Sequence, residues 1–361
     1  MRKGDRNMKK RNLFVILALV TMLGLTACGG KEETEAVKES KTTTEVESEV
    51  VKETREELAE GQMYSYLTGE VVDEAVGAAR PFAIMINNID ECLPQSGISQ
   101  ADILYECLVE ADITRLMGVF QDIENLNKVG SIRSARHYYM DFAKDEEAIF
   151  THYGQSIFAE ERINAGYQTI SGLSGYSEAV FYRSADRVAP HNVFSSKDGL
   201  LKGLEYTGLT RDYPEDYEGR LNFKTEEITL ENGVDANKVT MPFYYANPWF
   251  EYNEEEGLYY RYQYNSAHVD EENGEQLKFK NLIVQYTTYD LISDEGHKDF
   301  ALTGSGKGLL ITNGKAENIT WKRASENDRT MYYYEDGSPV YLNCGKSYIS
   351  IVPSDTPVIC E

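Results

Sequence analysis

The sequence predicts an α/β N-terminal domain, with strands and helices in layers, followed by a mostly β C-terminal domain. Between residues 77 and 222, strand-like and helix-like patterns alternate, which is typical of α/β layering. From residue 223 to residue 361, short β-rich runs are separated by Gly, Asn and Asp. The 285 residues that follow position 76 are enough for two ordinary domains.

In the first half, the strand-like runs are "PFAIMINN", "ITRLMGVFQ", "EAIFTHYG" and "AVFYRS". The helix-like runs are "SQADILYECLVEA", "ARHYYMDFA" and "SIFAEERIN". The first of these predicted helices depends on the spacing of Ile103, Cys107 and Leu108, with Ser99 as its N-cap.

In the second half, "KVTMPFYYA", "LYYRYQYN", "NLIVQYTTYD" and "GLLITNG" predict strands, and Asp336-Gly337 predicts a hairpin turn. The run "TGSGKG" lacks the pattern of a phosphate loop, because Ala301 and Gly308 stand where that loop needs Gly and Ser or Thr. We therefore expect a tight turn there. The many tyrosines fit half-buried sheet faces better than a platform for sugars.

The first 27 residues have the features of a secretory signal peptide. Six basic residues precede the apolar run "NLFVILALVTMLGL", which ends in the small residues before Cys28. The sequence "LTAC", Leu25 to Cys28, resembles the lipobox of bacterial lipoproteins. By that resemblance Cys28 becomes the lipidated, palmitate-carrying N-terminus on the outer face of the cell membrane. A plain secreted protein and a short uncleaved anchor are the alternatives.

Residues 28–76 begin with a stretch rich in Glu, Lys and Thr, and we expect them to form a disordered acidic tether. The formal net charge of −24 argues against non-specific binding to nucleic acid, which requires cations to neutralise phosphates. It also argues against flat binding to an anionic membrane, so the lipid must supply the attachment.

A local concentration of positive charge predicts an anion-binding site. In "VGSIRSARHYY", Ser134 is expected to cap a helix, whose first N–H groups favour an anion. Each neighbouring guanidinium can hold a phosphate or carboxylate with two hydrogen bonds. His152 ends a strand-like run, where α/β sites gather. The candidate anion-binding residues are Arg115, Arg133, Ser134, Arg136, His152, Arg187, His191 and Asn192.

Asp102, Glu106 and Glu110 provide a competing explanation. Their spacing places them on one face of the first predicted helix, from which they would neutralise the arginines in a structural ion-pair network. They would alternatively hold a divalent cation opposite the arginines, as a pyrophosphate site requires. We expect no other cofactor and no metal centre, and the sequence lacks the GxSxG and HExxH signatures. The cysteines Cys92, Cys107, Cys344 and Cys360 lack zinc-binding spacing, and free thiols are expected.

The motifs "PQSG", "ADILYE", "ITR", "RSAR" and "PHN" together resemble the YerB-like family of Gram-positive lipoproteins, a domain of unknown function. The resemblance runs from about Arg80 to Pro353. It implies a membrane-anchored extracytoplasmic protein and supplies no catalytic residues. The segment "DITRLMGVFQD…VGSIRSARHYY" is also similar, over one strand-turn-helix unit, to the LytR-CpsA-Psr wall-glycopolymer transferases. Those enzymes use arginines to hold a polyprenyl diphosphate.

From these features we expect a binding or scaffolding module of cell-envelope synthesis rather than an enzyme. The expected partners are the membrane, through the lipid, and a penicillin-binding protein or a wall-precursor ligand. The alternative is a LytR-CpsA-Psr-like transferase, or a binder, of polyprenyl-diphosphate-linked wall glycopolymers.

Overall fold

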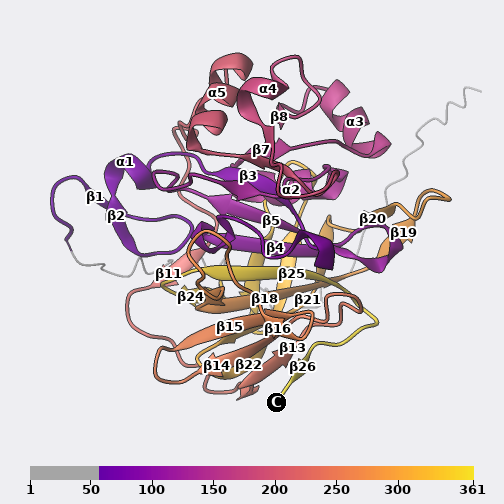
Figure 1. Cartoon of the computed structure of the whole chain (residues 1–361). Coiled ribbons are helices and arrows are strands. Elements are labelled where there is room, and N and C mark those ends of the chain that lie inside the picture. The colour runs from indigo at the N-terminus through magenta and orange to yellow at the C-terminus, as the bar shows by residue number, and fades with distance from the viewer. Residues whose placement is uncertain (1–56) are drawn as a thin grey trace, which may run out of the picture. The chain divides into compact units, whose positions relative to one another are not determined.

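The computed structural model describes residues 57–361, and Figure 1 shows how their strands and helices are arranged. The predicted signal peptide, Cys28 and most of the predicted tether lie outside the described residues. Within residues 57–361, none of the helices has the length and apolar character needed to cross a bilayer.

An 11-stranded sheet forms the centre of the protein, with the order β12-β22-β21-β18-β25-β4-β5-β3-β7-β8 and with β23 paired to β22. Its strands are β3 (Phe82–Asn87), β4 (Ile103–Leu108), β5 (Thr114–Phe120), β7 (Ile149–His152), β8 (Ile170–Ser171), β12 (Val234–Asp235), β18 (Asn281–Thr287), β21 (Gly304–Thr312), β22 (Lys315–Arg323), β23 (Met331–Tyr334) and β25 (Ser347–Pro353). β4 pairs in parallel with β25, so strands from both halves of the sequence belong to one sheet. The predicted boundary between residues 222 and 223 stays a prediction.

The described residues are predominantly β, and their helices are short. The helices are α1 (Glu74–Gly77), α2 (His137–Asp145), α3 (Ile157–Asn164), α4 (Ser177–Val180) and α5 (Lys197–Thr207), and single 3-10 turns are η1 (Asp90–Cys92), η2 (Ile98–Gln100) and η3 (Glu110–Asp112). In Figure 1, α3, α4 and α5 gather around β7 and β8. Ser156 and Ser196 cap α3 and α5, because their hydroxyl oxygens accept hydrogen bonds from backbone N–H groups three residues later.

A second, six-stranded sheet has the order β16-β15-β14-β13-β26, with β17 paired to β15. Its strands are β13 (Lys238–Thr240), β14 (Trp249–Asn253), β15 (Leu258–Gln263), β16 (Ser266–Ala267), β17 (Lys278–Phe279) and β26 (Ile359–Cys360). The ring of Tyr348, in β25, lies 4.8 Å from Phe250 and 5.8 Å from Phe279, measured between ring centroids. These aromatic contacts pack the second sheet against the first.

Four smaller sheets complete the fold of residues 57–361. They are formed by β1 (Gln62–Tyr64) with β2 (Val71–Asp73), by β6 (Val129–Gly130), β10 (Val193–Ser195) and β9 (Tyr182–Arg183), by β11 (Asn222–Lys224) with β24 (Tyr341–Asn343), and by β19 (Tyr289–Leu291) with β20 (Lys298–Phe300). The β1–β2 pair corrects the predicted end of the tether at residue 76. Leu67, between these strands, is fully buried, so the chain is folded well before that position.

Two other predictions are wrong. The run "SQADILYECLVEA" contains the strand β4 rather than a helix, and every residue of β4 is buried. A strand that is covered on both faces is apolar throughout, so its hydrophobic spacing can imitate that of a helix. The glycines of "TGSGKG" lie in β21 rather than in a tight turn.

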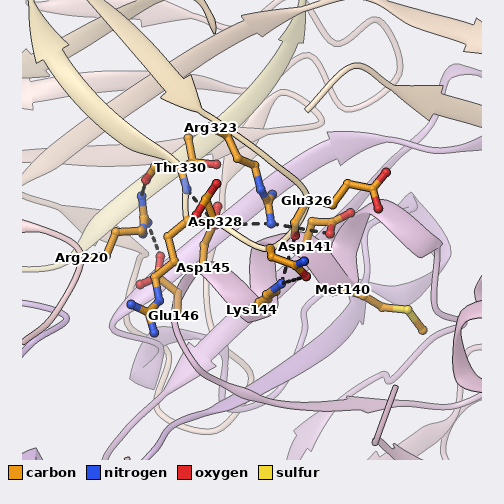
Figure 2. A network of polar contacts seen from close by, with 12 residues as sticks. Met140, Asp141, Lys144, Asp145, Glu146, Arg220, Arg323, Glu326, Asp328 and Thr330 are labelled. Carbon is orange, nitrogen blue, oxygen red and sulfur yellow. Dashed lines mark hydrogen bonds and ion pairs between the residues drawn. The ribbon is translucent and has the colours of Figure 1, made fainter. Parts of the chain in front are cut away.

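A network of buried charges connects the end of α2 to Arg220 and, through Arg220, to Thr330 in the second half of the chain (Figure 2). Arg220 forms an ion pair with Glu146, and the two side chains are 0% and 1% exposed. Arg220 also donates hydrogen bonds to the carbonyl oxygen of Thr330 at 3.0 Å and to the hydroxyl of Tyr105 at 2.9 Å. This network positions α2, which begins beside the candidate site.

Candidate anion-binding site

The candidate site lies at one edge of the central sheet. β3 and β7 are parallel, whereas β5 runs antiparallel to β3 and pairs Arg115 with Asn87. The start of β5 therefore lies at the same edge as the carboxyl ends of β3 and β7. His152 ends β7 at this edge. Ligands of open α/β sheets bind at such carboxyl edges.

The segment 133–136 is held between the ends of β3 and β7. The backbone N–H of Arg133 donates to the carbonyl oxygen of Met85 at 2.9 Å, and its carbonyl oxygen accepts from Tyr153 at 3.0 Å. These bonds hold the segment in an extended conformation. They bring the side chains of Arg133 and Arg136 to the edge where Arg115 begins β5.

The predicted helix cap at Ser134 is wrong. α2 begins at His137, and Arg136 occupies the N-cap position with an extended backbone and no capping hydrogen bond from its side chain. Ser134 contributes its carbonyl oxygen instead, which accepts a 2.7 Å hydrogen bond from Nη1 of Arg115. The helix start is displaced because the preceding residues pair with the sheet.

The three arginines differ in their partners. Arg136 donates to both carboxylate oxygens of Glu110, with 2.6 Å between Nε and Oε1. Among residues 57–361, no carboxylate lies within ion-pairing distance of Arg115 or Arg133. Arg133 donates from Nη1 to the carbonyl oxygen of Pro190 at 3.3 Å, and its buried Nε has no hydrogen-bond partner. The structural interpretation therefore applies to Arg136, whereas the other two guanidinium groups form no ion pair with a carboxylate of residues 57–361.

Burial is the main cause of a lowered pKa at Arg115, followed by the positive charges of Arg136 and Arg133, while the negative charge of Glu110 acts in the opposite direction. The pKa falls to about 9, so the guanidinium still carries its proton at neutral pH. Burial and the charge of Arg136 also lower the pKa of Arg133. Like charges held close together are electrostatically unfavourable, and a bound anion would relieve this repulsion.

His191 joins the cluster from the loop after β9. Its Nδ1 lies 2.8 Å from Nδ2 of Asn87, which donates to it and leaves the imidazole proton on Nε2. Burial, then the charge of Arg133, lowers the pKa of His191. The imidazole is therefore neutral at pH 7 and offers an N–H donor. Asn87 was not predicted, although a polar residue that ends an apolar strand is a signal for such a site.

Arg187, Asn192 and His152 support the surrounding backbone instead of joining the cluster. Arg187 lies 3.1 Å from Glu271 in an ion pair, and Asn192 donates to the carbonyl oxygen of Arg187 at 3.3 Å. His152 donates from Nδ1 to the carbonyl oxygen of Gly154 at 2.8 Å. Because it is buried, the pKa of His152 falls to about 4.

The three predicted acids do not share one face of a helix. Glu106 accepts hydrogen bonds from Arg261 at 2.6 Å and from Tyr348 at 2.7 Å, both in the second half of the chain. Asp102 accepts a 2.9 Å hydrogen bond from the backbone of Gln121. Of the three, only Glu110 reaches an arginine of the cluster. No group of three or more His, Cys, Asp or Glu side chains suited to a metal ion occurs in the described part of the chain, and a divalent cation at this edge stays a prediction.

Comparison with known proteins gives a consistent match along the chain. Residues 67–210 match the model described as "Protein of unknown function (DUF3048) N-terminal domain", and residues 239–349 match that of its C-terminal domain. The curated "Putative lipoprotein YerB" of Bacillus subtilis (strain 168) is 28% identical over 302 residues, which cover 80% of this chain and 85% of the relative. The crystal structure of YerB protein from Bacillus subtilis covers 82% of this chain and 99% of its own, with 28% identity and a TM-score of 0.72.

Proposed function

Because this chain belongs to the YerB-like family of DUF3048 proteins, we propose that it is a lipid-anchored protein of the cell envelope that binds an anionic ligand. The name of the Bacillus subtilis relative describes a lipoprotein, and Cys28 in "LTAC" is the residue proposed to carry the lipid. The chain would then act at the outer face of the membrane, as a binding or scaffolding module in envelope synthesis.

The observation that carries the anion-binding function is the pair of arginines without ion-paired carboxylates at the carboxyl edge of the sheet. Arg115 and Arg133 lack carboxylate partners among residues 57–361, in a sequence whose net charge is −24. Guanidinium groups bind phosphate oxygens strongly, and His191 adds a neutral N–H donor. The diphosphate of a wall precursor is the ligand class that we propose. A penicillin-binding protein is the partner proposed for the scaffolding role.

The arrangement supports binding more than group transfer. A LytR-CpsA-Psr-like site places acids that hold magnesium opposite its arginines. Here Glu106 faces Arg261, and Glu110 is bound by Arg136. The transferase alternative would need these acids to leave their present partners.

Inorganic pyrophosphate is a suitable probe for this proposal, titrated calorimetrically into the full chain in detergent micelles. Arg133→Gln removes a guanidinium that has one long hydrogen bond and no carboxylate partner. We expect the substitution to weaken pyrophosphate binding by about tenfold to a hundredfold, because hydrogen bonds between charged groups contribute about 1.5–3 kcal/mol.

Lys202→Gln is the matched control, since it removes one positive charge from an exposed ion pair with Glu205 on α5. This variant should bind pyrophosphate like the unmodified chain. If Arg133→Gln and Lys202→Gln have equal affinities, the arginines at the sheet edge do not form the binding site.

A further inference from the structure

The ladder between β18 and β21 does not include the first four residues of β21. The two strands pair antiparallel from Asn281 with Thr312 to Gln285 with Gly308. β21 begins four residues earlier, at Gly304, and pairs with β22 along its whole length. Within the part of the chain that the structure describes, residues 304–307 thus have a partner strand on one side only, and three of these four residues are exposed.

Trp321 occupies the place where the ladder ends. It pairs with Gly306 across β22 and β21, and its indole N–H donates a 2.8 Å hydrogen bond to the carbonyl oxygen of Tyr286. A side chain, rather than β21, therefore bonds to the backbone of β18 at this point. Gly306 makes room for the indole, because a Cβ at this position would lie 2.4 Å from the indole nitrogen.

The separation of the two strands leaves a cavity of about 380 Å³. Tyr286 and Trp321 supply its apolar lining, and the open edge of β21 forms one wall. A second cavity of about 380 Å³ shares the lining residues Ala301 and Thr303 with the first, so the two are neighbours on the protein surface. We call the two cavities together the β21 groove.

The chemistry of this groove favours an extended peptide. An open strand edge offers backbone N–H and C=O groups at the spacing that another polypeptide strand matches. Glycines at positions 304 and 306 keep the open edge free of bulky side chains where a second backbone would approach. Sugar stacking would need an exposed aromatic face, whereas Trp321 is 2% exposed.

We propose that the β21 groove binds an extended segment of a partner protein by strand addition, antiparallel to residues 304–307 of β21. In this position the segment pairs with β21 beyond the point where the pairing between β18 and β21 stops. One of its apolar side chains enters the cavity above Tyr286 and Trp321. Lys307 is exposed on the open edge and has no carboxylate partner among residues 57–361, so it favours an acidic residue at the position of the segment beside it. Asp355, which lines the same cavity, favours a basic or neutral residue at the position that approaches it. This proposal does not depend on the anion site, whose residues line neither cavity.

A random twelve-residue peptide library displayed on phage provides the probe. It is selected on the full chain in detergent micelles, and the most enriched sequence is synthesised with a fluorescent label. Thr303 is exposed and lines both cavities, so Thr303→Trp places a bulky indole where a bound segment would lie without disturbing the core. We expect this variant, checked for its thermal unfolding midpoint, to weaken peptide binding by about tenfold or more, since it occupies the binding volume.

Lys307→Glu is the second variant, and Lys322→Glu on the neighbouring strand β22 is its matched control. The first should weaken binding of the labelled peptide, and the second should leave it unchanged. Bound peptide should also slow hydrogen exchange of amides within residues 304–307, which is the direct sign of strand addition.

Three results would overturn the proposal. The first is a library that yields no peptide sensitive to Thr303→Trp. The second is a bound peptide that leaves exchange of residues 304–307 unchanged. The third is a concentration-dependent dimer of the full chain that Thr303→Trp abolishes, because a second copy would then occupy the groove.

Discussion

The buried ion pair of Arg220 and Glu146 gives a prediction whose size follows from the structure. Arg220→Met keeps a side chain of similar length but removes the charge, and with it the hydrogen bonds to Thr330 and Tyr105. Glu146 is 1% exposed, and its Oε2 already lacks a hydrogen-bond partner. The substitution therefore leaves a buried carboxylate that keeps a hydrogen bond from Tyr105 but has no ion-pair partner among residues 57–361. Breaking such a pair costs about 3–5 kcal/mol.

Urea unfolding of the full chain, followed by circular dichroism, measures this loss. Adding Glu146→Gln to Arg220→Met removes the unpaired buried charge. The double variant should therefore recover about half of the lost free energy of unfolding or more. Arg329→Met is the matched control, because Arg329 pairs with the neighbouring Glu147 at side-chain exposures of 34% and 22%. It should cost less than about 1 kcal/mol, as partly exposed pairs do.

Two results would refute this reasoning. If Arg220→Met costs no more than Arg329→Met, burial does not decide the energy of these pairs. If the double variant is as unstable as Arg220→Met alone, the loss comes from packing around α2 and not from the unpaired charge.

Three further changes have expected outcomes. Arg136→Gln should lower the free energy of unfolding by about 1–3 kcal/mol, measured in urea, because it leaves Glu110 without its bidentate partner. Burial lowers the pKa of His152 from 6.5 to about 4, so the folded state disfavours the protonated ring. The free energy of unfolding should therefore fall by up to about 3 kcal/mol as the pH falls from 6.5 through 4. In the His152→Gln variant, unfolding measured over the same pH range should lack this dependence. Gly306→Ala should destabilise the protein by about 1–3 kcal/mol, detected by indole fluorescence during unfolding, because the new methyl group meets Trp321.

The strands at the centre of the protein were predictable where an apolar run was short and bounded by turn residues. "PFAIMINN" and "ITRLMGVFQ" contain β3 and β5 as expected. β4 was not predictable in the same way, because both of its faces are buried and its spacing of apolar residues also fits a helix. The choice depends on pairing with β25, which lies more than two hundred residues later in the sequence.

The candidate site was predictable in part for a similar reason. Arg133 and Arg136 are close in sequence, so their proximity needs little tertiary information. The contribution of Asn87 and His191 depends on a loop that crosses the sheet edge, and no local pattern specifies that crossing. The failure of Ser134 as a cap likewise follows from hydrogen bonds between its segment and two strands.

The pleat of the sheet explains why the acids of β4 do not neutralise the cluster. Cys107 is the register partner of Arg115, so these two side chains lie on one face of the sheet. Glu106 precedes Cys107 and points to the opposite face, where it meets Arg261. Because side chains alternate along a strand, a slip of one residue would place the carboxylate beside Arg115. The register of β4 on β5 therefore does two things at once. It gives Arg261 the carboxylate that connects the two halves of the chain. It also leaves Arg115 without an ion-paired carboxylate, so that its positive charge remains for an anionic ligand.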